Sequence, residues 1–186
     1  MGSLFSVTYI VWGLSEIILN RLTRSTPGDK QNADKNSLAI IWITVVVAMT
    51  LAIYISSATR HPIHDNYAMP YIGLALVWLG VILRLTIIKT LGQFFTVDVT
   101  IRKDHKLKTD GFYKYLRHPS YSASLLSFLG FGVSLNNWIS LILIVTAIVI
   151  VFKNRINIEE KALIAYFGEE YLEYKAATKA IIPFVY

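Results

Sequence analysis

The fold is set by residues 121–152, which read YSASLLSFLGFGVSLNNWISLILIVTAIVIVF. Two apolar runs, at 121–135 and 139–152, are separated only by the triplet Asn-Asn-Trp, which predicts a tight hairpin of two helices. Three more apolar runs precede this hairpin along the chain, at 4–20, 38–57 and 71–88. Because a membrane span needs about 20 apolar residues and charged stretches separate the runs, the sequence predicts an all-α, polytopic membrane protein. We expect five transmembrane helices, including the short helical hairpin.

The composition agrees with this class of protein. The 186 residues fit a single membrane domain, 54% of them are hydrophobic and only 16% are charged. A soluble domain of this size would need a more polar surface. The absence of cysteine excludes disulfides and thiolate metal ligands, and we expect no metal site. Within the domain, we expect 1–90 to form a three-helix part with little chemistry and 91–186 to carry most of the chemically functional residues.

The positive charges predict the orientation in the membrane. With five spans, sixteen of the 18 lysines and arginines fall on one side, and positive residues mark the cytoplasmic side. We therefore expect the N-terminus outside and the C-terminus in the cytoplasm, on the same side as most of the polar residues of 91–186, and we assign no nucleic-acid partner to the net charge of +6. Glu16 and Arg84 lie inside the apolar runs, and we expect them to snorkel to the headgroups.

A polar corner precedes the fourth apolar run, in the stretch GFYKYLRHPSY at 111–121. Pro119 suits the first turn of a helix and keeps His118 extended, so Arg117, His118 and Tyr121 gather at a positive helix end that favours anions. A second Arg-His-Pro triplet, at 60–62, lacks the tyrosine and an acidic partner segment. We interpret that copy as structural.

An acidic cluster follows the fifth run and is expected to face this corner. Arg155 and Glu159 are four residues apart on one helix face and can pair, and Glu160 is next to them. On a water-exposed surface such a pair would contribute only ~0.3–0.5 kcal/mol. The hairpin, however, places it beside His118 at the membrane boundary, where ionisable residues are usually functional. We also expect an irregular cytoplasmic cap at 91–109 and an amphipathic C-terminal helix beyond residue 155, weakened or kinked at Gly168.

The second half of the chain resembles the isoprenylcysteine carboxyl methyltransferase and phospholipid methyltransferase family of integral membrane enzymes. The resemblance is carried by the polar corner, by Arg155 with Glu159 and Glu160, by His-Lys-Leu at 105–107 and by FGExY at 167–171. It implies S-adenosylmethionine as methyl donor, bound on the cytoplasmic side. The matching positions that it implies for this site are His105, Lys106, Leu107, His118, Pro119, Tyr121 and Glu160.

Two acceptor chemistries are consistent with these residues. A carboxylate needs no base at pH 7, and the planar fork of Arg155 would orient it while Glu159 holds Arg155. An amine, as in phosphatidylethanolamine, would need Glu159 to accept a proton. Arg155 favours the carboxylate on a lipid or prenylated substrate, with these two residues as the catalytic pair. The alternatives are a nicotinamide-dependent sterol reductase, which this short, cysteine-free chain fits poorly, and a non-enzymatic membrane scaffold.

Overall fold

The computed structural model describes residues 2–23, 36–92, 95, 97 and 106–182. In this part of the chain all regular structure is helical apart from one isolated β-bridge, which confirms the all-α class. The elements, in chain order, are α1 (Ser3–Leu22), α2 (Ser37–Ala58), α3 (Met69–Leu91), the 3-10 turn η2 (Gly111–Lys114), α4 (Pro119–Ser134), α5 (Trp138–Phe167) and α6 (Glu169–Ala177).

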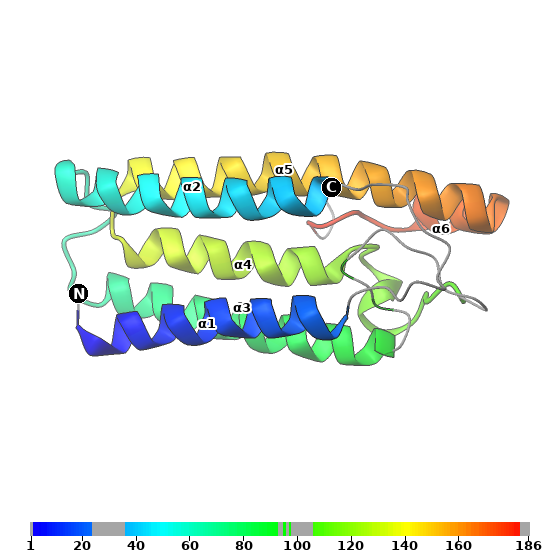
Figure 1. Ribbon diagram of the computed structural model, residues 1–186, viewed down its shortest axis with the longest axis horizontal. Coiled ribbons are helices and arrows are strands. Elements are labelled where there is room, and N and C mark those ends of the chain that lie inside the picture. Colours follow the sequence, from blue (N-terminus) through cyan, green and yellow to red (C-terminus); the bar gives the residue numbers. More distant parts are fainter. Residues whose placement is uncertain (1, 24–35, 93–94, 96, 98–105, 183–186) are drawn as a thin grey trace.

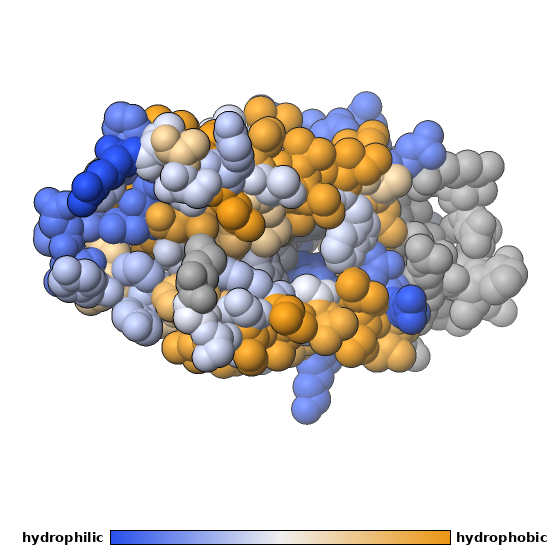
Figure 2. Space-filling model, turned by 60° about the vertical axis from the view of Figure 1, so that its left-hand side comes forward, coloured by the Kyte–Doolittle hydropathy of each residue, from blue (hydrophilic) through white to orange (hydrophobic). Residues whose placement is uncertain are grey.

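The first five α-helices run side by side in alternating directions, with α4 lying between the α2–α5 pair and the α1–α3 pair (Figure 1). Within the described residues, α1, α2, α3 and α5 are long and apolar enough to cross a membrane. With 16 residues, α4 is shorter than the usual span. Hydrophobic side chains form a band along the molecule, and hydrophilic residues gather at the left-hand end of the view in Figure 2. The chain is thus a polytopic membrane protein.

Small residues let α4 approach α3 closely. A Cβ added to Gly80 would lie 2.3 Å from Ser127 Oγ and 2.6 Å from the carbonyl oxygen of Ala123. Gly73 and Gly130 face each other in the same way, since a Cβ on Gly130 would lie 2.6 Å from the Gly73 carbonyl oxygen. Inside a bilayer the hydrophobic effect does not drive helices together, and small residues allow the close van der Waals packing that does. This packing fixes the position of α4 relative to α3.

The tight hairpin predicted between α4 and α5 is confirmed. Asn136 adopts a positive φ of 47°, and the Asn137 side chain caps α5 by accepting from the backbone N–H groups of Ile139 and Ser140 at 3.0 and 3.1 Å. The Asn137 amide also donates to the Thr59 carbonyl oxygen at 3.2 Å. The nearby His61 carbonyl oxygen accepts from the Trp138 N–H at 2.9 Å. The first Arg-His-Pro triplet therefore lies at the hairpin turn, away from the second triplet.

The fifth apolar run is longer as a helix than its sequence pattern indicates. We placed its end at Phe152, but α5 continues without a break to Phe167, because nothing before Gly168 interrupts the backbone. Gly168 ends α5 in a positive-φ conformation, at 59°, and α6 follows it directly. The predicted tail helix is therefore an extension of α5 plus the nine-residue α6. Much of the predicted cap at 91–109 lies outside the described residues.

Candidate active site

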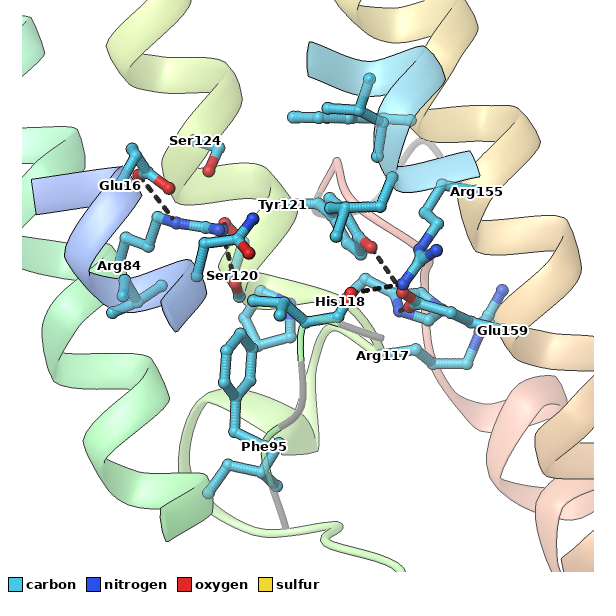
Figure 3. Close-up of a pocket in the computed structure, with 18 of the residues that line it drawn as sticks. Glu16, Arg84, Phe95, Arg117, His118, Ser120, Tyr121, Ser124, Arg155 and Glu159 are labelled. Atoms are coloured by element: carbon cyan, nitrogen blue, oxygen red, sulfur yellow. Dashed lines mark hydrogen bonds and ion pairs between the residues drawn. The ribbon is translucent and has the colours of Figure 1, made fainter. Parts of the chain in front are cut away.

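A cavity of about 390 Å³ lies at the end of the molecule where α4 begins and α1, α3 and α5 approach their ends. Its volume falls in the range usual for ligand pockets. One part is apolar and lies between α1, α2 and α4, with Trp12, Trp42, Val45, Met49 and Phe128 among its lining residues. The other part is polar, and its walls carry two charged clusters that face each other across the first turn of α4 (Figure 3).

The first cluster centres on Arg155, which is only 2% exposed. Its Nε donates to Glu159 Oε1 at 3.0 Å, which confirms the predicted i,i+4 pair. Its Nη1 donates to the Ser37 hydroxyl of α2, and its Nη2 donates to the Val97 carbonyl oxygen at 2.6 Å. Tyr121 donates to the same Glu159 oxygen at 2.5 Å. Protein groups thus engage all three nitrogens of the guanidinium.

The corner before α4 joins this cluster, as predicted from the hairpin. His118 Nδ1 lies 3.5 Å from Glu159 Oε2, and His118 Nε2 lies 3.3 Å from Glu160 Oε1. Glu160 also accepts from Arg117 Nε and from Lys175 Nζ, both at 2.7 Å. One buried carboxylate therefore ties the corner to α6, and such charge-assisted bonds are among the stronger ones in proteins.

The chain beyond α6 fixes the backbone of the corner. The N–H groups of Arg117 and His118 donate to the carbonyl oxygens of Lys179 and Ala180 at 2.8 and 3.0 Å. The Ser122 hydroxyl donates to the Ile181 carbonyl oxygen at 2.5 Å. With Pro119 in the first turn of α4, these bonds hold His118 in its non-helical conformation. The contribution of residues 179–181 was not predicted from the sequence.

The second cluster is formed by Glu16 and Arg84, and it corrects a prediction. We expected these side chains to snorkel to the headgroups, but Arg84 Nε lies 3.0 Å from Glu16 Oε1, and both residues line the cavity. Arg84 Nη1 donates to the Ser120 hydroxyl at 2.8 Å and to its carbonyl oxygen at 3.1 Å. Opposite charges inside a membrane lower their cost by pairing, and these two lie close enough to do so.

The predicted donor-site residues differ in their positions. Leu107, His118, Pro119 and Tyr121 line the cavity. Lys106 is exposed and is not among the lining residues. Glu160 does not line the cavity either, but it holds His118, which does. His105 lies outside the described residues.

Tyr171 of α6 is a site residue that sequence analysis did not select. It is 1% exposed and lines the cavity, and its hydroxyl has no hydrogen-bond partner in the part of the chain that the structure describes. Burial raises the pKa of this hydroxyl well above its ordinary value, so it remains a donor at neutral pH. A buried donor without a partner is costly, and the position of this hydroxyl at the cavity makes it a candidate donor to a ligand. Tyr171 is the last residue of the FGExY motif, so this motif could have identified it from the sequence.

Comparisons with known proteins identify relatives of this chain. Residues 72–165 match the model of the isoprenylcysteine carboxyl methyltransferase (ICMT) family. The chain is 36% identical to protein-S-isoprenylcysteine O-methyltransferase B of Arabidopsis thaliana over 82% of this chain and 81% of that protein. It is 30% identical to the probable protein-S-isoprenylcysteine O-methyltransferase of Oryza sativa subsp. indica over 98% and 95% of the two chains.

A solved structure is similar as well. The eukaryotic intramembrane Ras methyltransferase ICMT superposes with a TM-score of 0.62 at 31% identity, over 84% of this chain. This chain covers 55% of the length of that protein. The family match extends from α3 to the last turns of α5, so it includes the corner, Arg84 and the Arg155–Glu159 pair. By sequence and structure alike, the chain belongs to the isoprenylcysteine carboxyl methyltransferase family.

Proposed function

We propose that this chain, an S-adenosylmethionine-dependent methyltransferase by family, methylates the carboxylate of a prenylated cysteine at the cytoplasmic face of a membrane. The observation that carries the proposal is the two-part cavity. Its apolar part suits an isoprenoid chain, and Arg84, Arg117 and Arg155 line its polar part, where their positive charges attract a carboxylate. The relatives from Arabidopsis thaliana and Oryza sativa are named for the same acceptor, an isoprenylcysteine.

The residues of the cavity fit the methyl donor. When bound, S-adenosylmethionine supplies an electrophilic methyl group on a sulfonium cation. Aromatic rings attract cations, and Tyr113, Tyr121, Tyr171 and Tyr174 line the cavity, with Glu159 among them. The Tyr171 hydroxyl, unpartnered among the described residues, supplies one donor for the cofactor. Leu107, His118 and Pro119 border the same space, and His105, Lys106 and Glu160 stay as predictions of the resemblance.

The acceptor carboxylate is ionised at neutral pH, so this chain needs to orient it rather than to deprotonate it. We assign this task to the polar part of the cavity. In the described part of the chain Arg84 Nη2 has no hydrogen-bond partner, which leaves it available to a carboxylate oxygen. Arg155 faces it from the other wall, with its fork held by Glu159, Ser37 and Val97. Arg155 and Glu159 act here through charge and through Tyr121, which they hold in place.

Positioning is the main contribution of the protein. Holding two reactants in line replaces a bimolecular encounter and contributes up to about 7–11 kcal/mol to lowering the barrier. Residues of α1 and α2 line the apolar part of the cavity, and a prenyl chain that enters between these helices would bring its carboxylate to the start of α4. In this arrangement α4 completes five spans, the N-terminus lies outside, and the C-terminus lies in the cytoplasm, as the distribution of lysine and arginine favours.

A methyl-transfer assay with a chemical read-out tests the proposal. Purified protein in lipid vesicles receives methyl-labelled S-adenosylmethionine and either N-acetyl-S-farnesylcysteine or phosphatidylethanolamine. We expect label on the farnesylated acid, and mild alkali should release it as methanol, since methyl esters hydrolyse and N-methyl groups do not. The methyl ester of the same acceptor should remain unlabelled. Alkali-stable label on the phospholipid would overturn the carboxylate assignment in favour of N-methylation by Glu159 acting as a base.

A further inference from the structure

The first helix contributes a single charged side chain to the cavity. Much of α1 faces outward with apolar residues, and Leu14, Ile17 and Ile18 are 42–55% exposed. Glu16 lies between them in sequence, but its side chain points into the cavity toward Arg84 (Figure 3). An acidic residue inside a membrane helix is costly and marks a function by default. The family match begins at residue 72 and assigns nothing to this residue.

Glu16 and Ser120 hold the Arg84 guanidinium from two sides. Ser120 accepts two hydrogen bonds from Nη1, whereas Glu16 Oε1 lies 3.0 Å from Nε. The Nε–H is not directed at a hydrogen-bond acceptor in the described part of the chain. The contact with Glu16 is therefore an ion pair that depends on charge and not on a directed bond. Of the three nitrogens, Nη2 alone has neither kind of contact among the described residues.

We propose that Glu16 is a positioning residue for methyl transfer: its charge holds Arg84 so that Nη2 meets the acceptor carboxylate in the orientation needed for attack. This inference rests on the proposed carboxylate acceptor. Glu16 also neutralises the Arg84 guanidinium, which would otherwise bind the acceptor carboxylate too strongly and out of line with the methyl group. Interactions that are equally strong in the ground state and in the transition state do not raise kcat. By partly neutralising Arg84 and fixing its guanidinium, Glu16 makes Arg84 orient the acceptor carboxylate rather than only bind it tightly.

This role predicts an unusual kinetic effect for Glu16→Gln. Glutamine keeps the size of the side chain but loses the charge, and no directed hydrogen bond exists for its amide to preserve. The Arg84 guanidinium then gains mobility, and its positive charge is no longer neutralised by a neighbouring carboxylate. We expect kcat to fall by about tenfold to a hundredfold, the range that follows from a misplacement of about 1 Å, while KM for N-acetyl-S-farnesylcysteine stays constant or falls. The affinity for S-adenosylmethionine should stay within about twofold.

Three companion variants separate this role from general damage. Ser15→Ala removes a neighbouring polar group that, among the described residues, bonds to its own helix at the Trp12 carbonyl oxygen, and this variant should retain wild-type kinetics. Glu16→Asp keeps the charge on a shorter side chain and should recover part of the lost kcat. It also serves as the test if the Gln variant does not fold. In an Arg84→Gln background, Glu16→Gln should cause no further loss, because Glu16 acts through Arg84.

Two results would overturn the inference. The first is a Glu16→Gln enzyme with the kcat of the Ser15→Ala control. The second is a loss that appears only as a higher KM, or that remains undiminished in the Arg84→Gln background, because Glu16 would then act on binding or on folding. Failure of the proposed function is a separate outcome, since the wild-type protein itself would then leave the farnesylated acid unlabelled.

Discussion

Replacing Arg155 by lysine keeps the positive charge on α5 but removes the planar fork. Arginine reaches Glu159, Ser37 and Val97 with three different nitrogens, whereas the single ammonium of lysine can follow at most one of these directions well. At least two hydrogen bonds from a charged group are therefore lost. Each contributes about 1.5–3 kcal/mol, so we expect Arg155→Lys to lower the free energy of unfolding by about 3–6 kcal/mol.

Thermal unfolding in detergent measures this loss. For a chain of this length 1 kcal/mol corresponds to roughly 2–4 °C, so the Tm should fall by at least about 6 °C. Lys161→Arg, an exchange of cations at an exposed position of the same helix, is the control and should leave the Tm unchanged. Turnover should fall as well, because Arg155 holds Glu159 and thereby Tyr121.

The reasoning would be refuted by an Arg155→Lys protein with a wild-type Tm and a strongly reduced kcat. That result would mean that the contacts of Arg155 with α2 and with Val97 contribute little to stability. The guanidinium would then be free to turn toward the acceptor carboxylate, which is the role that its sequence position first indicated. Full turnover together with a wild-type Tm would remove Arg155 from both roles.

Three further predictions concern the donor site and the membrane topology. Tyr171→Phe should leave the Tm nearly unchanged, because its hydroxyl has no partner in the described chain, but should weaken S-adenosylmethionine binding by about tenfold, the effect of one lost hydrogen bond. Equal affinities in a calorimetric titration would contradict this. His118→Ala should weaken donor binding, because His118 lines the cavity between Glu159 and Glu160, whereas His61→Ala at the opposite end should not. The same donor affinity in both histidine variants would contradict the site. Reporter fusions should place residue 30 in the cytoplasm and residue 64 outside, and a cytoplasmic signal at 64 would reverse the orientation.

Sequence analysis succeeded where the rules are local. The apolar runs locate the helices. The Asn-Asn-Trp turn is so short that α4 and α5 must be antiparallel neighbours. Once the hairpin is fixed, the corner at His118 and the pair Arg155–Glu159 must lie at the same end of the molecule. The i,i+4 spacing then determines which face they share. These steps need no knowledge of how distant helices pack.

The contacts that sequence analysis missed are those between helices far apart in the chain. No periodicity indicates that α1 lies beside α3, and without that neighbour Glu16 and Arg84 are two isolated charges. The positions of Glu16 and Arg84 along their helices nevertheless indicate that the two charges could meet. Glu16 precedes the end of α1 by six residues and Arg84 precedes the end of α3 by seven. Both helices run in the same direction, so at 1.5 Å per residue the two charges lie at about the same level in the bilayer.

The first turn of α4 explains why the two clusters belong to one site. Ser120 and Tyr121 are consecutive, and consecutive residues on an α-helix point about 100° apart. Ser120 therefore faces α3 and accepts from Arg84, while Tyr121 faces α5 and donates to Glu159. The motif at 117–121 therefore has two roles. It forms the corner before α4, and its last two residues, Ser120 and Tyr121, set the separation between the guanidinium groups of Arg84 and Arg155. The close packing of α4 on Gly80 keeps that separation constant.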